Sequence, residues 1–331
     1  MPDRSQQMQR WLTGLGYADF QLSPASEDAS FRSYWRLEGS SGTYIVMDAP
    51  PDMESCDGFI QIAEKLRHAD LNAPEVIARN LDQGFLLLTD FGNHSYLSQL
   101  DQVSMRSLYA DAIDALHRMQ LQIDVTGLPA YDENLLLQEM DLFHDWFLNR
   151  LLDIHLNLEQ HESWHRIKQN LAENALAQPQ VFVHRDYHSR NLMKLDHGNP
   201  GILDFQDAVA GPITYDLVSL LRDCYIAWPQ ADVEQIAFDF YHQARDDERI
   251  GVDASQFLHW FDLMGVQRHL KAIGIFSRLK IRDGKAGYLL DIPRVLEYVL
   301  EVSRRNTSIS ELHDLIETLD LNHKLGAGLS S

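Results

Sequence analysis

The stretch from Val181 to Asp204 constrains the fold of this 331-residue chain more than any other. It begins with an apolar run, Val181 to Val183, of the kind that forms a short buried strand. A loop of charged and polar residues follows this run, and a second apolar pair, Ile202-Leu203, leads into Asp204. Loops fixed by strands are common carriers of catalytic side chains, so we expect the chemistry of the protein here.

Three side chains in this stretch have the spacing that phosphoryl transfer requires. Asp186 lies in the loop, Asn191 follows five residues later, and Asp204 lies thirteen residues beyond Asn191. In this reaction the protein positions a hydroxyl, accepts its proton and holds Mg²⁺ on the triphosphate. The pattern predicts Asp186 as the base and Asn191 and Asp204 as oxygen ligands of Mg²⁺. The alternative is a surface turn rich in histidine and aspartate.

Composition excludes several other classes of function. The formal charge of −21 argues against nucleic acid or an anionic membrane as a partner. Two cysteines, Cys56 and Cys224, give neither a disulfide framework nor a metal cluster, which suits a reducing cytoplasm. No apolar run approaches the ~20 residues of a membrane span, and no signal peptide follows Met1. We expect a cytoplasmic monomer.

The periodicity of the chain predicts an α+β, bilobal fold. Residues 1–91 are expected to form a small β-rich N-lobe, and residues 92–331 a large, mainly helical C-lobe. The tail from Leu319 is expected to be loosely ordered. The N-lobe elements are a helix over Ser5–Leu15, a loop and then a strand over Ser23–Leu37, strands at Thr43–Met47, Pro74–Ala78 and Gly84–Thr89, and a helix around Phe59–Leu66.

Three familiar motifs are rejected. Gly14-Leu15-Gly16 lacks the third glycine and the preceding strand of a dinucleotide site. Asp90-Phe91-Gly92 precedes the loop of Asp186 by about ninety positions, so Asp204 is the better metal ligand. The stretch from His161 to His165 matches a zinc-protease signature, but its polar flanks favour a solvated helix.

With both lobes in view, the chain resembles the aminoglycoside phosphotransferase family, the small-molecule branch of the protein-kinase-like fold. The resemblance implies ATP as co-substrate, Mg²⁺ as cofactor, and His188 beside Asp186 in the catalytic machinery. The absence of an Ala-Pro-Glu motif after Asp204 separates the chain from protein kinases. The residues that carry the resemblance are His184–Asn191, Leu203–Phe205, Gly211-Pro212 and Tyr215-Asp216.

More narrowly, the chain is similar to the bacterial kinases that phosphorylate the anomeric hydroxyl of N-acetylmuramate and N-acetylglucosamine in peptidoglycan recycling. The supporting segments are Ala29–Arg32, Tyr44–Pro51, Glu139–Phe143 and Gln267–Lys271. The resemblance implies that the ATP phosphates and the adenine contact Ser30, Phe31, Arg32, Thr89, Asp90 and Phe91.

Candidate contacts of the sugar also follow from this resemblance. Glu139, Asp141 and Asp223 are candidate acceptors for sugar hydroxyls; for the first two, a solvated helix face is the alternative. Arg268 or Lys271 could meet the lactyl carboxylate of muramate, with ion pairing to neighbouring acids as the alternative.

The chain departs from the kinase pattern at one point. A typical kinase has a lysine on its third strand that pairs with the phosphates and with a helix glutamate. The strand Tyr44–Asp48 has no lysine, and the matching helix position near Phe59 is not a glutamate. Either Arg32 or Arg36 acts at the phosphates instead, or ATP binds weakly.

Two alternative functions therefore stay open. The first is a phosphotransferase of the same family that acts on another hydroxyl acceptor, such as an aminoglycoside, choline, homoserine or methylthioribose. The second is a non-catalytic nucleotide-binding pseudokinase, motivated by the missing lysine. Because Asp186, Asn191 and Asp204 are all present, the sequence favours an active enzyme.

Overall fold

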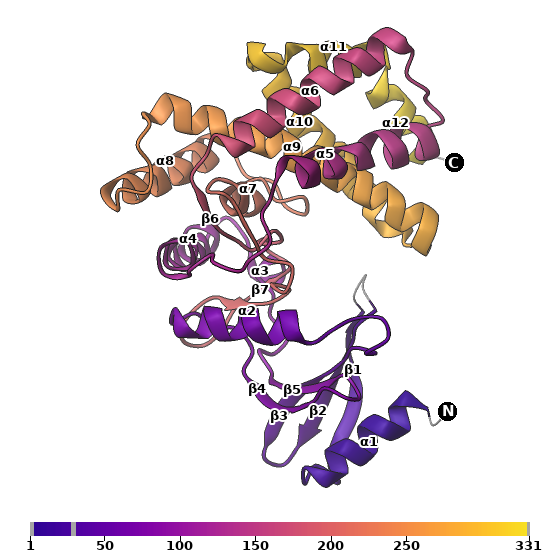
Figure 1. The fold of residues 1–331 in the computed structure, drawn as a ribbon, viewed down its shortest axis with the longest axis vertical. Coiled ribbons are helices and arrows are strands. Elements are labelled where there is room, and N and C mark those ends of the chain that lie inside the picture. Colours follow the sequence, from indigo (N-terminus) through magenta and orange to yellow (C-terminus); the bar gives the residue numbers. More distant parts are fainter. Residues whose placement is uncertain (1–2, 28–30, 330–331) are drawn as a thin grey trace. The chain divides into compact units, whose positions relative to one another are not determined.

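The computed structural model describes residues 3–27 and 31–329 and divides the chain into two compact units (Figure 1). The first unit comprises Met1–Ala115 and Arg190–Asp207, and the second unit comprises Leu116–Ser189 and Ala208–Ser331. The predicted lobes, 1–91 and 92–331, divide the chain differently and stay a prediction. Residues 190–207 belong to the first unit because β7 (Leu192–Met193) pairs with β8 (Gly201–Ile202), and the Ile202 N–H donates to the Asn72 carbonyl at 2.7 Å.

Among the described residues, the first unit contains a five-stranded antiparallel sheet with the order β1-β2-β3-β5-β4. Its strands are β1 (Gln21–Glu27), β2 (Ser33–Gly39), β3 (Gly42–Asp48), β4 (Val76–Asn80) and β5 (Phe85–Thr89). Strand β5, which lies between β3 and β4, is buried from Phe85 to Leu88, so both of its faces are covered. The helices of this unit include α1 (Arg4–Gly14), α2 (Asp57–His68) and α3 (Tyr96–Gln99).

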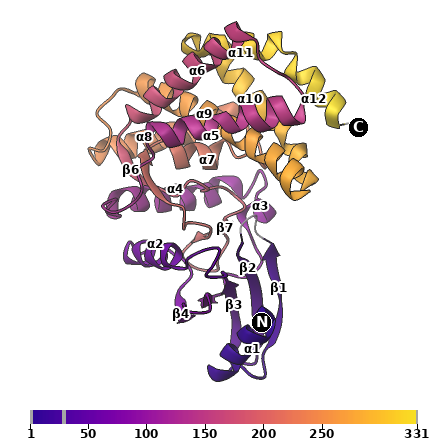
Figure 2. The same ribbon diagram turned by 45° about the vertical axis from the view of Figure 1, so that its right-hand side comes forward.

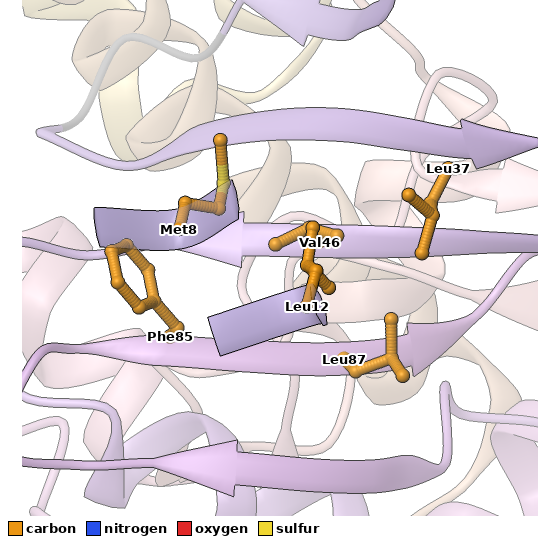
Figure 3. Close-up of a cluster of buried hydrophobic side chains, with 6 residues drawn as sticks. All are labelled: Met8, Leu12, Leu37, Val46, Phe85 and Leu87. Carbon is orange, nitrogen blue, oxygen red and sulfur yellow. The ribbon is translucent and has the colours of Figure 1, made fainter. Parts of the chain in front are cut away.

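Helix α1 forms a core with one face of this sheet (Figures 2 and 3). Asp3 caps its start, because its carboxylate accepts the Ser5 N–H at 3.3 Å. Met8 and Leu12 share one helical face and lie among side chains of β2, β3 and β5. The predicted N-terminal helix is thus confirmed. The buried residues of this core are Met8, Leu12, Leu37, Val46, Phe85 and Leu87.

Strand β1 corrects the expectation of a loop at the start of Ser23–Leu37. Gln21 pairs with Glu38 and Glu27 with Ser33, so this segment is the edge strand of the sheet. Pro24 and the serines beside it have low strand propensity, which conceals the strand in the sequence. An edge position tolerates the proline, and the register shifts between Pro24 and Ser26.

The second unit is mainly helical, and α9 (Ala254–Asp283) is its central helix (Figures 1 and 2). Asp253 caps its start and Gly284, with φ +71°, ends it. It packs against α5, α6, α7 and α10, and both views show the last of these beside it. The neighbouring helices are α5 (Glu133–Leu142), α6 (Leu158–Leu176), α7 (Tyr215–Leu221), α8 (Gln230–Asp246), α10 (Ile292–Arg305) and α11 (Ser310–Thr318). With the sheet of the first unit, this confirms the predicted α+β class.

One helix is irregular, and one expectation is corrected. The apolar residues from Leu135 to Phe147 do not lie on one regular helix, because α5 passes into a π-helix over Phe143–Leu151. The tail beyond Leu319 is not loosely ordered up to Leu329, because α12 (Leu321–Leu329) buries Leu321 and Leu325.

Helix α4 spans Met105–Gln122. Within residues 3–27 and 31–329, no helix has the length and apolar character needed to cross a membrane.

Gly274 allows α9 to approach the point where α5 changes into the π-helix. A Cβ at this position would lie 2.3 Å from the carbonyl carbon of Leu142 and 2.5 Å from its oxygen. Backbone atoms cannot rotate away as a flexible side chain can, so the two helices would have to separate.

We expect Gly274→Ala to lower the free energy of unfolding by about 1–3 kcal/mol, measured by urea denaturation. Gly326→Ala in α12 is the matched control, since its Cβ would meet nothing within 4 Å. We expect the control to be neutral or to stabilise the protein by up to about 1 kcal/mol. Equal stability of the Gly274 variant and the wild type would contradict the close contact.

Candidate functional site

The loop that carries Asp186 follows a short buried strand of the second unit. Strand β6 (Gln180–Val183) pairs antiparallel with β9 (Val209–Pro212), and Val183 pairs with Val209. The strand predicted at Val181–Val183 is thus confirmed. We call residues 184–189, which follow it, the catalytic segment.

Asp216 holds the start of the catalytic segment. One oxygen of its carboxylate accepts the His184 N–H at 2.6 Å, and the other accepts the Arg185 N–H at 3.0 Å. Arg185 has φ +78°, a left-handed conformation that is rare for a residue other than glycine. Such strain persists only where the surroundings hold it, and it is most frequent at functional sites.

Asp216 lies in the first turn of α7. Its bonds to the catalytic segment join residues that are far apart in the chain, so the sequence does not reveal them. Burial raises the pKa of Asp216 to about 7, against the opposing effect of the two N–H donors and with a further raising effect from Asp186. The group therefore titrates near neutral pH.

The electrostatic surroundings of Asp186 favour its charged form. Burial by itself raises the pKa of this carboxyl, but Lys271, His188 and Arg268 lower the pKa below its ordinary value. His188 is buried, its N–H donates to the Asp186 carbonyl at 3.0 Å, and its ring meets Tyr225 edge-on at 5.3 Å. Asp186 is therefore ionised at neutral pH, as a base for proton transfer must be.

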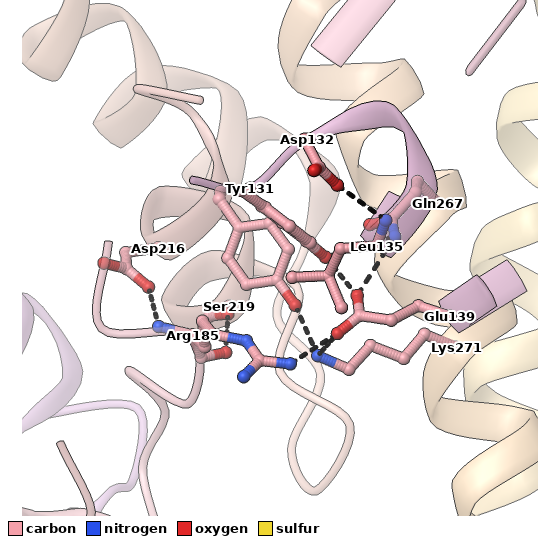
Figure 4. A network of polar contacts seen from close by, with 10 residues as sticks. Tyr131, Asp132, Leu135, Glu139, Arg185, Asp216, Ser219, Gln267 and Lys271 are labelled. Atoms are coloured by element: carbon pink, nitrogen blue, oxygen red, sulfur yellow. Dashed lines mark hydrogen bonds and ion pairs between the residues drawn. The ribbon is translucent and has the colours of Figure 1, made fainter. Parts of the chain in front are cut away.

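Glu139 is the centre of a buried ionic network in the second unit (Figure 4). Its carboxylate, on α5, forms ion pairs with the Arg185 guanidinium and with the Lys271 ammonium, the latter at 2.9 Å. Tyr131 donates its hydroxyl to the same carboxylate, and Gln267 donates to the Tyr131 oxygen at 3.2 Å. Burial alone raises the pKa of Glu139, but Lys271 and Arg185 bring it below the ordinary value. Glu139 thereby links α5 and α9 to the catalytic segment.

The five predicted sugar contacts lie at different places in the second unit. Glu139 and Lys271 belong to the network just described, and Lys271 also donates to the Tyr215 hydroxyl at 3.1 Å. Lys271 thus forms the ion pair given as the alternative, and its contact with the sugar stays a prediction. Arg268, from the same face of α9, is buried and donates to the Cys224 sulfur at 3.5 Å.

The other two predicted acceptors are engaged elsewhere. Asp141 forms an ion pair with Lys168 of α6 and is 42% exposed, so the structure does not bring it into the network of Glu139. Asp223 accepts the Ser189 N–H at 2.9 Å and the Tyr225 N–H at 2.8 Å. Asp223 thus braces the end of the catalytic segment, as Asp216 braces its start.

The predicted metal ligands lie together in the first unit. The Asn191 side-chain amide donates to Asp204 at 3.3 Å, and the Leu203 N–H donates to the Asn191 carbonyl at 2.9 Å. Asp204 has φ +62°, again a left-handed conformation, and also accepts a bond from Gln206 at 2.8 Å. An amide and a carboxylate oxygen fit Mg²⁺, which takes few protein ligands when phosphates and waters supply the others. In the described part of the chain no group of three or more His, Cys, Asp or Glu side chains could hold a metal.

The predicted nucleotide contacts also belong to the first unit. Ser30 lies outside the described residues. Phe31 is 63% exposed, whereas Arg32 is buried and forms an ion pair with Glu54. These neighbours in the sequence are therefore placed in very different surroundings.

The predicted adenine hinge continues directly from β5. Thr89 accepts the Glu75 N–H on its hydroxyl at 3.0 Å, and Asp90 binds the Arg36 guanidinium at 2.7 and 3.0 Å. The Phe91 ring packs on Gly201, where a Cβ would come within 2.7 Å of it. Thr89, Asp90 and Phe91 are therefore each held by contacts within the first unit, and their role at the adenine stays a prediction.

Comparison with known proteins places the chain among phosphotransferases. A family model described as the phosphotransferase enzyme family matches residues 21–250. The N-acetylmuramate/N-acetylglucosamine kinase of Pseudomonas putida is 46% identical over 299 residues, which cover 90% of this chain and 88% of that protein. The kinase of the same name from Neisseria meningitidis serogroup B is 40% identical and covers 99% of both chains.

A solved structure shows the same fold at low sequence identity. The ADP-bound aminoglycoside phosphotransferase APH(2'')-Ib superposes with a TM-score of 0.55 at 16% identity, covering 85% of this chain and 94% of that one. The predicted kinase-like fold and the predicted family resemblance are both confirmed.

We expect Glu139→Gln to lower the free energy of unfolding by about 3–5 kcal/mol, because it leaves two buried cations without their counterion. Glu311→Gln is the matched control, since Glu311 pairs with Arg166 at the surface, with exposed fractions of 48% and 56%. The control should lose less than about 1 kcal/mol by urea denaturation. Equal losses in the two variants would contradict the role of Glu139.

We expect Asp216→Asn to change how stability depends on pH. The pKa of Asp216 is about 7 in the folded protein, against an ordinary value of 3.8. The folded state therefore binds the proton more tightly, so the stabilising contribution is complete below pH 3.8 and is lost as pH rises through about 7. Urea denaturation from pH 4 to 8 should show a steeper fall for the wild type than for the variant. Parallel curves would contradict the raised pKa.

Proposed function

The chain belongs to the phosphotransferase enzyme family, and from this membership we propose that it is a sugar kinase. In this proposal it uses ATP and Mg²⁺ to phosphorylate the anomeric C1 hydroxyl of N-acetylmuramate and N-acetylglucosamine, which yields sugar 1-phosphates for peptidoglycan recycling. Among the structural observations, the ionised Asp186 on its braced segment carries the kinase assignment. The relatives from Pseudomonas and Neisseria, similar over most of their length, support the choice of acceptor.

Asp186 is the proposed catalytic base. It accepts the proton of the C1 hydroxyl while that oxygen forms a bond to the γ-phosphorus and the bond from phosphorus to the ADP oxygen breaks. An anomeric hydroxyl is more acidic than the other hydroxyls of a sugar, so a carboxylate of low pKa is a sufficient base. Correct positioning of the base then contributes more to the rate than its basicity does.

Asn191 and Asp204 are the proposed ligands of Mg²⁺. Both offer hard oxygen atoms, and the contact at 3.3 Å between their side chains supports a shared ion. Once bound, the ion would neutralise the developing charge on the phosphates. Because ATP is the proposed co-substrate, the proposal also supports the cytoplasmic location that the sequence predicts.

Arg268 is the better candidate for the lactyl carboxylate of muramate. Lys271 already pairs with Glu139, whereas the bond that Arg268 makes is to the weak acceptor Cys224 Sγ. The Nε of Arg268 has no hydrogen-bond partner among the described residues. A buried guanidinium with donors to spare is suited to binding a carboxylate. Glu139, Asp141 and Asp223 stay proposed contacts of the sugar hydroxyls, and Glu139 is the one that pairs with Lys271.

We expect ³¹P NMR of the protein with ATP, Mg²⁺ and either sugar to show a sugar 1-phosphate resonance coupled to the anomeric proton. Asp186→Asn should lower kcat by about 10²–10⁴-fold while ADP still binds. Asp145→Asn, which removes a carboxylate that is 58% exposed on the π-helix, is the matched control and should keep wild-type activity.

Other outcomes would redirect the assignment. ADP formation without the anomeric signal would indicate another hydroxyl or another acceptor. ATP binding without turnover of any acceptor would indicate a pseudokinase, and an active Asp186→Asn variant would contradict the assignment of the base.

A further inference from the structure

Arg36, one of two candidates to replace the missing kinase lysine, is already engaged. Its Nε and Nη2 donate to the two oxygens of Asp90 at 2.7 and 3.0 Å, and Nη2 also donates to the Gly92 carbonyl at 3.0 Å. The Asp90 side chain is only 3% exposed. This two-point contact uses the geometry that a guanidinium would need to bind a phosphate. Arg36 therefore serves to fix the segment after β5.

Arg32, the second candidate, lies at the end of the sheet where β2 begins and β3 ends. It directly precedes β2, whose first residue, Ser33, pairs with Asp48 at the end of β3. This is the strand on which a typical kinase carries its lysine. The Arg32 side chain is 5% exposed and forms an ion pair with Glu54, from the segment between β3 and α2.

One of the acids that act on Arg32 lies near the proposed metal ligand Asp204 in the sequence. Burial by itself lowers the pKa of Arg32, but Tyr34, Glu54 and Asp207 together raise it above its ordinary value. Asp207 follows three residues after Asp204, in the same unit. Arg32 is thus a permanent buried cation close to the segment that holds the proposed Mg²⁺ ligand.

We propose that Arg32 and Glu54 together replace the absent lysine–glutamate pair: Arg32 binds the phosphates of ATP, and Glu54 is the positioning residue that holds it. The inference rests on the proposed use of ATP. A guanidinium has five donors in a planar fork, so one edge can hold a carboxylate while another binds phosphate oxygens. Glu54 also supplies the counterion that a buried cation requires when no nucleotide is bound.

The test measures nucleotide binding by calorimetry and needs no acceptor. Arg32→Met should weaken Mg·ADP by about 10- to 100-fold, since hydrogen bonds to charged groups are lost, and should leave adenosine binding unchanged. Glu54→Gln should weaken Mg·ADP by a smaller factor, and Glu54→Asp should restore part of the loss. The double variant should bind Mg·ADP no more weakly than Arg32→Met, because Glu54 acts through Arg32.

Two control variants separate this role from general damage. Arg67→Met removes an exposed pair with Glu75 in the same unit, with exposed fractions of 44% and 55%, and should leave Mg·ADP binding unchanged. Arg36→Met loosens the predicted adenine hinge and should weaken adenosine and Mg·ADP alike. If, among these variants, only Arg32→Met weakens Mg·ADP binding without weakening adenosine binding, the loss is specific to the phosphate contact of Arg32.

Wild-type affinity of Arg32→Met for Mg·ADP, or an equal loss of adenosine binding, would overturn the proposal. If Arg32→Met does not fold, Arg32→Lys carries the test, because it keeps the charge and loses the fork. This variant should still bind Mg·ADP several-fold more weakly than the wild type, and unchanged affinity would overturn the proposal. The two proposals can fail separately. If Arg32→Met weakens only Mg·ADP binding while the wild type phosphorylates neither sugar, the role of Arg32 is supported and the proposed acceptor is contradicted.

Discussion

The buried carboxylate of Asp216 is the constraint on which the second unit's chemistry depends. It accepts two adjacent backbone N–H groups and thereby holds Arg185 in a left-handed conformation that this residue would seldom adopt. Glu139 then binds the Arg185 side chain, and Asp223 binds the backbone at Ser189. Asp216 from α7, Glu139 from α5 and Asp223 from the loop after α7 thus hold the start of this segment, its Arg185 side chain and its end. Asp186 lies within that segment, so its position is set before any substrate binds.

The same arrangement explains how Asp186, the proposed base, can stay ionised although it is partly buried. Burial would protonate Asp186, but Lys271, His188 and Arg268 outweigh this effect. Lys271 can remain charged there because Glu139 pairs with it at 2.9 Å. Glu139, which binds the Arg185 side chain, therefore also holds one of the cations that keep Asp186 charged. A change at Glu139 would alter stability and electrostatics together, so its effects on rate and on folding must be measured separately.

The sequence was most informative where function depends on local spacing. Asp186, Asn191 and Asp204 are recognisable because their order along one loop and two strands is itself the motif. The bracing roles of Glu139 and Asp216 depend on contacts between residues far apart in the chain, which spacing does not reveal. Strand β1 was concealed because Pro24 is tolerated only at an edge, and edge positions depend on the whole sheet.

The missing lysine shows how a chain can depart from a motif and still hold a buried cation at the same end of the sheet. The kinase motif places its lysine at one position of one strand. Phosphate binding requires only that a cationic side chain lie beside the phosphate oxygens, whichever residue carries it. Arg32 directly precedes β2 and Glu54 lies before α2, so neither occupies the position that the kinase pattern names. The pair is nevertheless buried and mutually compensated, which a lone substituted cation would not be. The missing lysine by itself favours a pseudokinase, whereas the buried pair of Arg32 and Glu54 supports the proposed contact with the nucleotide phosphates.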